Sequence, residues 1–478
     1  MLLQFLQNIQ DALDVSVLAY SATALALLLG LIITIVTQTG HRTNVRRSLT
    51  QLQRYGVFKS NMADQYDAKF DIPEDARVDG PVRIKALYIH PIKSCGPIEL
   101  DRGLLTKSGF LFDRCFAFAT EVVDTDTPGK GTKWRFISQR TLPAMSQVKT
   151  ELWLPHEKSN PQDPLVQAGG CVAFSFNDPD PPDWRSRLEA CFLTWDRRAI
   201  PQLSFIVPLQ PTASQIEEFQ IGFKDFGIHA RGAKGLDMGM IPSVAASLPK
   251  LKKFLGIPQH QSLTLLRCTP ETLVRTNMNL APLQQIGSPS VHGYTDQQPL
   301  NINSLSSVNA VSALLPPENQ PLDALRFRAN IWITGAPAYA EETWKRYRIR
   351  PKHTTPQQQR RQQQPRANVA PNVSVVCRTA RCTMTNVKTD TGVFDADLPA
   401  PDKKKGKAQP STTLVKYRMV ETTNGNALGY LGMHCVPEDA DFEEARRQNA
   451  PLCVEVGDEI EVLEQGVHIY GSTRDAYQ

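Results

Sequence analysis

The hydrophobic and polar positions divide the chain into an apolar N-terminal stretch and a long region of short alternating segments. The apolar stretch runs for 22 residues without a charged side chain, from Val15 to Val36. At a rise of about 1.5 Å per residue, a helix of this length covers roughly 33 Å, which is enough to cross a hydrocarbon core of about 30 Å. The pattern therefore predicts one transmembrane helix at residues 15–36, within an N-terminal membrane anchor at residues 1–41.

The charges around this stretch predict its orientation. Acidic residues precede it, whereas Arg42, Arg46 and Arg47 follow it. Because basic residues are enriched on the cytosolic side of a membrane, we expect the rest of the chain in the cytosol. A cleaved signal peptide is the alternative, although such peptides usually have a basic start and a shorter apolar run. The sequon at Asn372 separates the two, since it is glycosylated only in a lumenal domain.

Beyond a polar connector at residues 42–81, the pattern predicts a β-rich α+β fold. A strand is expected over "VRIKALYIH" (82–90), and others near residues 114–123, 134–140 and 146–154. These segments are short and are punctuated by Gly, Pro and Asp, as is typical of barrels and sandwiches. Helical periodicity predicts a helix that ends before Gly256, one that begins at Asn303 and one that begins at Ala338. Two polar, Pro-rich inserts, 353–372 and 400–411, are expected to be disordered.

Length and composition narrow the choice of function. A chain of 478 residues exceeds the usual size of one core, so two or three domains are expected. A net charge of +5 is small for this length and does not indicate a nucleic-acid-binding surface. The nine cysteines have no dense spacing, which is typical of a protein in a reducing compartment.

Two cysteines, Cys377 and Cys382, lie close together in "VVCRTARCTMTNVKTDTG". A free cysteine is most often a small buried hydrophobe, so this is the first interpretation of either one. A structural zinc site would need a second pair at a compatible spacing, and Cys435 and Cys453 lie far downstream and far apart. Their spacing alone does not decide between these interpretations.

Several motifs in one order resemble the MOSC-domain family, and within it the membrane-anchored amidoxime-reducing proteins of the mitochondrial outer membrane. The N-terminal motifs are "LYIHPIKSCGPIEL" (87–100) and "GFLFDRCFAF" (109–118). "YTDQQPL" (294–300) and "RFRANIWITGAPAYAEETWKRYRI" (326–349) follow. The C-terminal motifs are "ARCTMTNVKTDTG" (380–392), "LGYLGMH" (428–434) and "VEVGDEIEVL" (454–463).

The resemblance implies two β-barrel domains that together hold a mononuclear molybdenum cofactor. They would be a MOSC N-terminal domain at 82–262 and a MOSC domain at 263–470, which contains the two inserts. Cys382 matches the family's molybdenum ligand, and Cys377 is expected to be unligated. His434 replaces an aromatic hydroxyl of the family and is a candidate proton donor or cofactor contact; a satisfied core histidine is the alternative. The positions that match contacts to the pterin and its phosphate are Lys93, Ser94, Arg114, Arg328, Asn330, Ala380 and Arg381.

Elementary chemistry agrees with these implied roles. A sulfur-rich molybdenum centre accepts a soft thiolate, and Arg378 and Arg381 flank Cys382. Arginine offers planar paired donors to a phosphate and lysine a point charge. As isolated residues, Lys93, Arg114 and Arg328 would suit solvent-exposed turns or strand edges better than a binding site, whereas within the matched motifs the binding interpretation is favoured. The chain departs from the family at 296–298, at Asn386 and at His434, which puts the choice of substrate in doubt more than metal binding.

The resemblance implies an oxidoreductase that reduces N-hydroxylated substrates such as amidoximes, hydroxylamines and N-oxides. The sequence has no haem, iron–sulfur or dinucleotide-binding motif, so a separate electron donor is expected. The resemblance implies cytochrome b5 and its NADH-dependent reductase. The mitochondrial outer membrane is the expected location and the endoplasmic reticulum the alternative. Two other functions stay open: a cofactor carrier or sulfur-transfer module, although no pyridoxal phosphate domain is recognisable, and a non-catalytic membrane scaffold.

Overall fold

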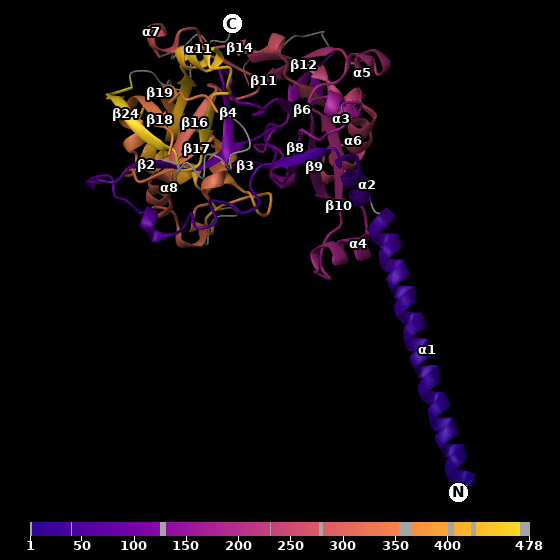
Figure 1. Cartoon of the computed structure of the whole chain (residues 1–478). Helices are drawn as coiled ribbons and strands as arrows, with labels where there is room; N and C mark the ends of the chain where they lie inside the picture. The colour runs from indigo at the N-terminus through magenta and orange to yellow at the C-terminus, as the bar shows by residue number, and fades with distance from the viewer. Residues whose placement is uncertain are drawn as a thin grey trace.

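Two β-barrels and a protruding N-terminal helix make up the molecule in the computed structural model (Figure 1). The structure describes residues 2–39, 41–124, 131–229, 231–276, 281–352, 366–399, 406–421 and 427–468. The barrels and their helices confirm the predicted β-rich α+β fold.

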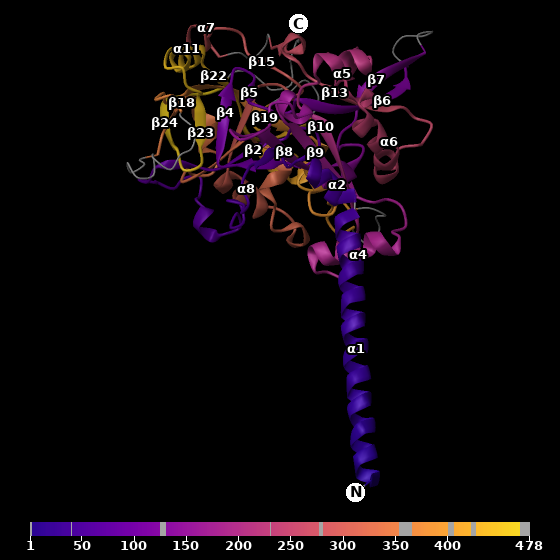
Figure 2. The same cartoon turned by 45° about the vertical axis from the view of Figure 1, so that its right-hand side comes forward.

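The N-terminal helix α1 (Leu2–Thr39) extends far from the globular body in both views (Figures 1 and 2). Its apolar window, Val17–Thr34, is long and apolar enough to cross a membrane, and none of it is buried in the protein. The predicted helix at 15–36 is confirmed as a helix and is longer at both ends. Crossing of a membrane stays a prediction. Helix α2 (His41–Ser48) leads from α1 into the body.

A closed five-stranded barrel forms the first half of the body. Its strands are β6 (Phe116–Val123), β7 (Thr132–Phe136), β11 (Phe223–Ile228), β12 (Arg231–Asp237) and β13 (Leu263–Arg267). A four-stranded antiparallel sheet packs beside it, and the rings of Phe118 and Phe174 lie 6.0 Å apart across the contact. This sheet contains β1 (Leu52–Tyr55), β8 (Lys149–Pro155), β9 (Cys171–Asn177) and β10 (Gln202–Pro208).

A second barrel forms the other half. Its strands follow the order β17-β16-β22-β19-β18-β24-β2, and the pairing of β17 with β2 closes it. The bounds of these strands are β17 (Ile331–Thr334), β16 (Leu300–Ser304), β22 (Gly429–Pro437), β19 (Asn372–Arg381), β18 (Trp344–Arg350), β24 (Glu459–Gln465) and β2 (Val82–Ile89). Strand β3 (Ile98–Leu100) extends β2 at the edge.

Short strands and helices complete the body. Among the described residues the short strands are β4 (Arg102–Thr106), β5 (Gly109–Phe110), β14 (Val274–Arg275), β15 (Val291–His292), β20 (Val387–Lys388), β21 (Val393–Phe394) and β23 (Cys453–Glu455). The helices that follow α2 are α3 (Pro164–Gln167), α4 (Trp184–Thr194), α5 (Ala213–Glu218), α6 (Pro242–Leu255), α7 (Leu283–Ile286), α8 (Leu305–Ser312), α10 (Ser411–Arg418) and α11 (Asp439–Arg447).

Strand pairing divides the chain between the two barrels, whereas the predicted domain boundaries, 82–262 and 263–470, stay a prediction. Strand β13 (263–267) belongs to the first barrel, so the change from one barrel to the other comes after Arg267. Strand β2, the first strand of the predicted N-terminal domain, belongs to the second barrel. The predicted connector at 42–81 is partly built into the fold, because β1 pairs with β8.

Two further local predictions are corrected and two are confirmed. The helix expected from Ala338 is one short 3-10 turn followed by β18, whose Trp344, Tyr347 and Ile349 are buried. Parts of the inserts expected to be disordered, 366–372 and 406–411, have defined places in the fold; 353–365 and 400–405 lie outside the described residues. Helix α6 ends as predicted, with Gly256 in the left-handed conformation at φ 72°. Helix α8 lies where the helix near residue 303 was expected.

Candidate functional site: a cationic cavity between the barrels

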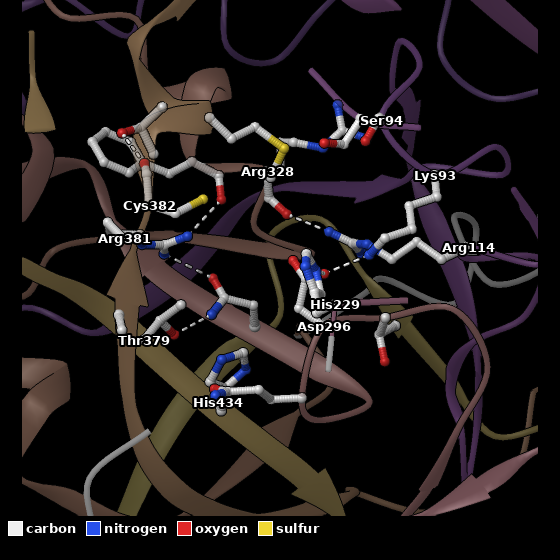
Figure 3. A pocket seen from close by; sticks show the side chains of 18 of the residues that line it. Lys93, Ser94, Arg114, His229, Asp296, Arg328, Thr379, Arg381, Cys382 and His434 are labelled. Carbon is white, nitrogen blue, oxygen red and sulfur yellow. Dashed lines mark hydrogen bonds and ion pairs between the residues drawn. The ribbon is translucent and has the colours of Figure 1, made fainter. Parts of the chain in front are cut away.

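A cavity of about 550 Å³ opens where the two barrels meet (Figure 3). Phe136, Arg140 and His229 reach it from the first barrel and its loops. Most of the other lining residues come from the second barrel and the loops that connect its strands. All nine site residues that the sequence predicts line this one cavity: Lys93, Ser94, Arg114, Arg328, Asn330, Ala380, Arg381, Cys382 and His434.

Cys382 lies at the end of β19, where the chain leaves the barrel and turns into a short 3-10 helix. Its carbonyl oxygen accepts a hydrogen bond from the Thr385 hydroxyl at 3.1 Å, which fixes the turn. The thiol lies on the cavity wall and is partly exposed. Cys377, five residues earlier on the same strand, is 1% exposed, sits in a buried apolar cluster and is not among the lining residues. The two cysteines therefore have different surroundings.

Arg381 is held rigidly next to Cys382. Its guanidinium donates to the carbonyl oxygens of Leu431 at 2.7 Å and Phe327 at 2.8 Å, and to Oδ1 of Asn301 at 3.3 Å (Figure 3). Burial lowers its pKa to about 9, while the neighbouring Cys382 opposes that shift. Arg381 is thus still charged at neutral pH. Arg378, the other arginine expected to flank the thiol, bonds instead to Glu342 and Glu421.

Three cavity residues adopt the left-handed backbone conformation without being glycine: Ser94 at φ 67°, Arg114 at φ 48° and Arg328 at φ 52°. Such residues are uncommon and cluster at functional sites, where the surrounding structure holds them. Here the turns are tied together, because Arg114 Nη2 donates to the carbonyl of Arg328 at 2.9 Å. Arg328 Nη1 in turn donates to the carbonyl of Cys95 at 2.8 Å.

Arg328 carries a buried donor that no protein group satisfies. Its Nη2 has no hydrogen-bond partner among the described residues. Burial and the nearby Arg114 lower the pKa of Arg328 to about 9. An unsatisfied buried donor on a charged group costs free energy unless a ligand accepts from it.

Asn330 connects several segments around the cavity by hydrogen bonds. Its amide donates to Asp113 at 3.0 Å and to the Tyr88 carbonyl at 3.2 Å, and its Oδ1 accepts from the Asn301 backbone. Asp113 also receives Arg114 Nη1 at 2.5 Å. Asn330 therefore has a clear structural role in addition to its place on the cavity wall.

Lys93, Asp296 and His229 form a linked cluster on another wall. Lys93 pairs with Asp296 and donates to the Tyr294 carbonyl at 2.9 Å, and His229 Nε2 lies 3.0 Å from Asp296 Oδ1. Burial lowers the pKa of Lys93 to about 8, although Asp296 opposes the shift. Burial alone would raise the pKa of Asp296, but Lys93 and His229 hold it well below its usual range. The cluster can hold and pass a proton at the cavity wall.

His434 projects from β22, where it stands opposite Asn301 in the adjacent strand. Its Nδ1 is buried and has no hydrogen-bond partner among the described residues. Burial, and then Arg381, lower its pKa to about 3. His434 is therefore neutral at physiological pH and is not a satisfied core histidine.

The lining carries an excess of positive charge. Its one acidic side chain is Asp296, against six cationic ones: Lys93, Arg114, Arg140, Arg326, Arg328 and Arg381. Lys93, Arg114 and Arg326 form ion pairs with Asp296, Asp113 and Asp395. Within the described part of the chain, the guanidinium groups of the other three have no carboxylate partner. Buried charges are normally paired, so this cavity is built for an anionic ligand.

Several residues that line the cavity were not predicted from the sequence. Thr379, Asn301 and Arg326 lie inside or next to the motifs and could have been found from their positions alone. His229 and Arg140 both lie between the motifs at 109–118 and 294–300, and no sequence signal marks them. Asn386, one of the positions at which the chain departs from the family, does not line the cavity and is buried against Ser411, to which its amide donates at 2.9 Å.

Comparison with known families identifies this architecture. The fold and the site define the class of protein: two β-barrels with a cationic, cysteine-bearing cavity at their junction. The MOSC N-terminal beta barrel domain matches residues 81–168 and the MOSC domain matches residues 289–461, so the chain is a MOSC-domain protein. No curated protein matches the chain. MOSC domains are associated with binding of the molybdenum cofactor and occur in sulfurase-like proteins and in oxidoreductases.

Proposed function

We propose that this protein is a molybdenum-cofactor oxidoreductase that reduces N-hydroxylated substrates, such as amidoximes, hydroxylamines and N-oxides. The observation that carries the proposal is the cavity itself. It places the accessible thiol of Cys382 in one pocket with Arg140, Arg328 and Arg381, the three lining arginines that have no carboxylate partner among the described residues. A soft metal ligand and an anion-binding wall are the two things that a metal-bearing pterin phosphate requires.

The donor set fits this cofactor. Cys382 would ligate the metal, and the free Nη2 of Arg328 would donate to the phosphate or the pterin. Ser94, Arg114 and Ala380 line the same cavity and would complete the contacts. When bound, the cofactor supplies two-electron oxygen-transfer chemistry that no side chain can perform.

The chain's own residues position the reaction and manage its charge. Arg381 keeps a fixed positive charge beside the sulfur of Cys382. His434, which is neutral, can donate or accept a hydrogen bond in the cavity. The Asp296 and His229 pair also lines the cavity and could supply a proton to an N-hydroxyl oxygen that leaves as water.

Electrons are proposed to come from a cytochrome b5 type donor and its NADH-dependent reductase. Helix α1 would hold the protein on the same membrane surface as such donors, which raises their effective concentration. The mitochondrial outer membrane is the proposed location, with the body in the cytosol.

The test measures molybdenum and pterin in the full chain, purified in detergent from a host that makes the cofactor. Wild type, Cys382→Ala and the matched control Cys377→Ala are compared. We expect about one metal ion per chain in wild type and in the control, and at least a tenfold loss in Cys382→Ala, because only Cys382 faces the cavity. Reduction of benzamidoxime with a b5-type donor should follow the metal content.

The other outcomes discriminate among the alternatives. Bound cofactor with no turnover of any amidoxime, hydroxylamine or N-oxide would favour a carrier or sulfur-transfer module. Folded wild-type protein with neither metal nor pterin would reject the enzyme and leave the membrane scaffold. Equal metal in Cys382→Ala and wild type would remove the assigned ligand.

A further inference from the structure

A short helical segment stands apart from the body beside the N-terminal helix. Helix α4 and the turn after it, residues 184–200, project below the first barrel, and α4 packs against α1 (Figures 1 and 2). We call residues 184–200 the α4 segment. It lies between the regions that match the MOSC N-terminal beta barrel domain (81–168) and the MOSC domain (289–461), so neither match includes it.

The α4 segment exposes large apolar side chains to solvent. Trp184 is 59% exposed, Trp195 89% and Ile200 58%, and no residue of α4 is buried. Trp195 also adopts the left-handed backbone conformation, at φ 57°. A bulky aromatic residue held in that conformation while facing outward is unusual. Several large exposed apolar residues on one short segment indicate a contact surface.

Positive charge surrounds these apolar residues. Four arginines, Arg185, Arg187, Arg197 and Arg198, outnumber the two acids Glu189 and Asp196. The Arg185 guanidinium lies 5.3 Å from the ring of Trp184. Exposed Arg46 and Arg47 on α2 add to the charge near the same end of α1. Tryptophan together with arginine is the composition of a membrane interface, where aromatic rings sit at headgroup level and cations meet anionic lipids.

The position of the α4 segment along α1 fits that interface. The α1 side chains are exposed from Val17 to Leu31 and first become partly covered at Ile32 and Ile33. These two residues lie near the C-terminal end of the apolar window, which ends at Thr34. A bilayer crossed by that window would have its surface at this level. The α4 segment therefore meets α1 at the height where the headgroups would begin.

We propose that the α4 segment is a second membrane contact, which lies in the headgroup region of the bilayer that α1 crosses. This inference rests on α1 being a membrane anchor and is independent of the proposed catalysis. Trp184, Trp195 and Ile200 enter the boundary between headgroups and acyl chains, and the arginines contact anionic headgroups. One helix alone would let the body swivel, whereas two contacts fix its tilt and the direction in which the cavity faces.

Tryptophan quenching by brominated lipid tests this contact on the full chain. The chain has six tryptophans, and none lies in α1, so the anchor itself adds no signal. Wild type is reconstituted into phosphatidylcholine vesicles, with and without phosphatidylserine, that carry lipid brominated near the headgroup. Trp184→Phe/Trp195→Phe is compared with the matched control Trp134→Phe/Trp153→Phe, which removes two tryptophans from the first barrel and its adjoining sheet.

We expect brominated lipid to quench wild type and the control, and the quenched emission to fall more than twofold in Trp184→Phe/Trp195→Phe. Replacing the four arginines of the α4 segment by glutamine should abolish the extra quenching that phosphatidylserine brings. Equal quenching in both double variants would overturn the proposal, as would failure of the chain to float with vesicles. Shielding of Trp184 and Trp195 from aqueous iodide without quenching by lipid would also overturn it, because a protein partner would then cover the α4 segment.

Discussion

Arg328 shows most directly what the cavity is built to hold. Its left-handed backbone aims a guanidinium inward, one nitrogen is anchored to the Cys95 carbonyl and the other is left without a partner. Arg326, two residues earlier, lines the same cavity but is already paired with Asp395 at 2.8 Å. Arg326 also has an unpartnered Nε, but Asp395 balances its charge, whereas Arg328 has no carboxylate partner among the described residues.

Arg328→Lys should weaken cofactor retention, since lysine keeps the charge but lacks the planar fork that lets one guanidinium nitrogen bond the Cys95 carbonyl while the other points at a phosphate. We expect a loss of roughly tenfold in bound pterin, measured by fluorescence after oxidation. Arg326→Lys is the control and should retain more pterin. An equal loss in both variants would contradict the special role of the free nitrogen.

His434 should make stability depend on pH in a defined window. Its pKa is about 3 in the fold against an ordinary value of 6.5, because burial disfavours the charged ring. The unfolded chain therefore takes up a proton below pH 6.5 that the folded chain does not, and the stability present above that pH is lost as the pH falls from 6.5 toward 3.

His434→Gln should remove this dependence. Between pH 7 and pH 5 we expect the cofactor-free variant to lose up to about 2 kcal/mol less unfolding free energy than wild type, as measured by urea denaturation. Parallel loss in the two proteins would show that the ring is solvated and titrates normally.

Strand β22 supplies both the ring of His434 and the space for Arg381. Gly432, at φ 76°, sits where a Cβ atom would lie 2.8 Å from the Ile302 carbonyl and 3.1 Å from Arg381 Nη2. This strand needs a residue without a side chain at that position, because the guanidinium of Arg381 passes next to it.

Gly432→Ala should accordingly lower the unfolding free energy by about 2–4 kcal/mol and displace Arg381. Thermal denaturation, read with molybdenum content, checks both effects. Gly232→Ala on β12 is the control, because a Cβ atom there meets nothing within 4 Å. A variant at Gly432 as stable as this control would mean that the strand can relax around the added methyl group.

In the whole molecule, the N-terminal helix is structurally separate from the two barrels. Helix α1 contributes no strand to either barrel and its apolar window is not buried, so the body does not depend on it for its core. Its proposed task is to hold the cavity on the surface where the electron donor moves.

Deletion of residues 1–41 should leave molybdenum content unchanged and strongly reduce flotation with vesicles, since only the contact of the α4 segment would remain. Turnover with a donor embedded in the same vesicles should fall roughly tenfold, while turnover with a soluble donor domain stays the same. Loss of metal on deletion would show that the helix supports the fold, and an unchanged rate with the embedded donor would show that shared attachment is unimportant.

Features with local causes could be predicted from the order of the amino acids. An unbroken apolar run defined the N-terminal helix, alternation defined β2, and Gly256 defined the end of α6. Where both a helical and a strand periodicity fit the same residues, the sequence-based prediction was wrong. The segment of β18 has a helical pattern, but it forms a strand because it pairs with β19 and β24. The motifs also named the nine site residues, through resemblance to a family and not through any contact visible in the sequence.

Features that depend on residues far apart in the chain could be seen only in the folded protein. Pairing of β17 with β2 closes the second barrel across more than half the sequence and places an early strand in the late domain. The same folding joins 93–94, 328–330 and 380–382 in one cavity, brings in His229, and pairs some of its cations while leaving others without a carboxylate. Charge pairing and burial are properties of neighbours in space, so the unpaired cations of the cavity and the exposed apolar side chains of the α4 segment become visible only once the chain is folded.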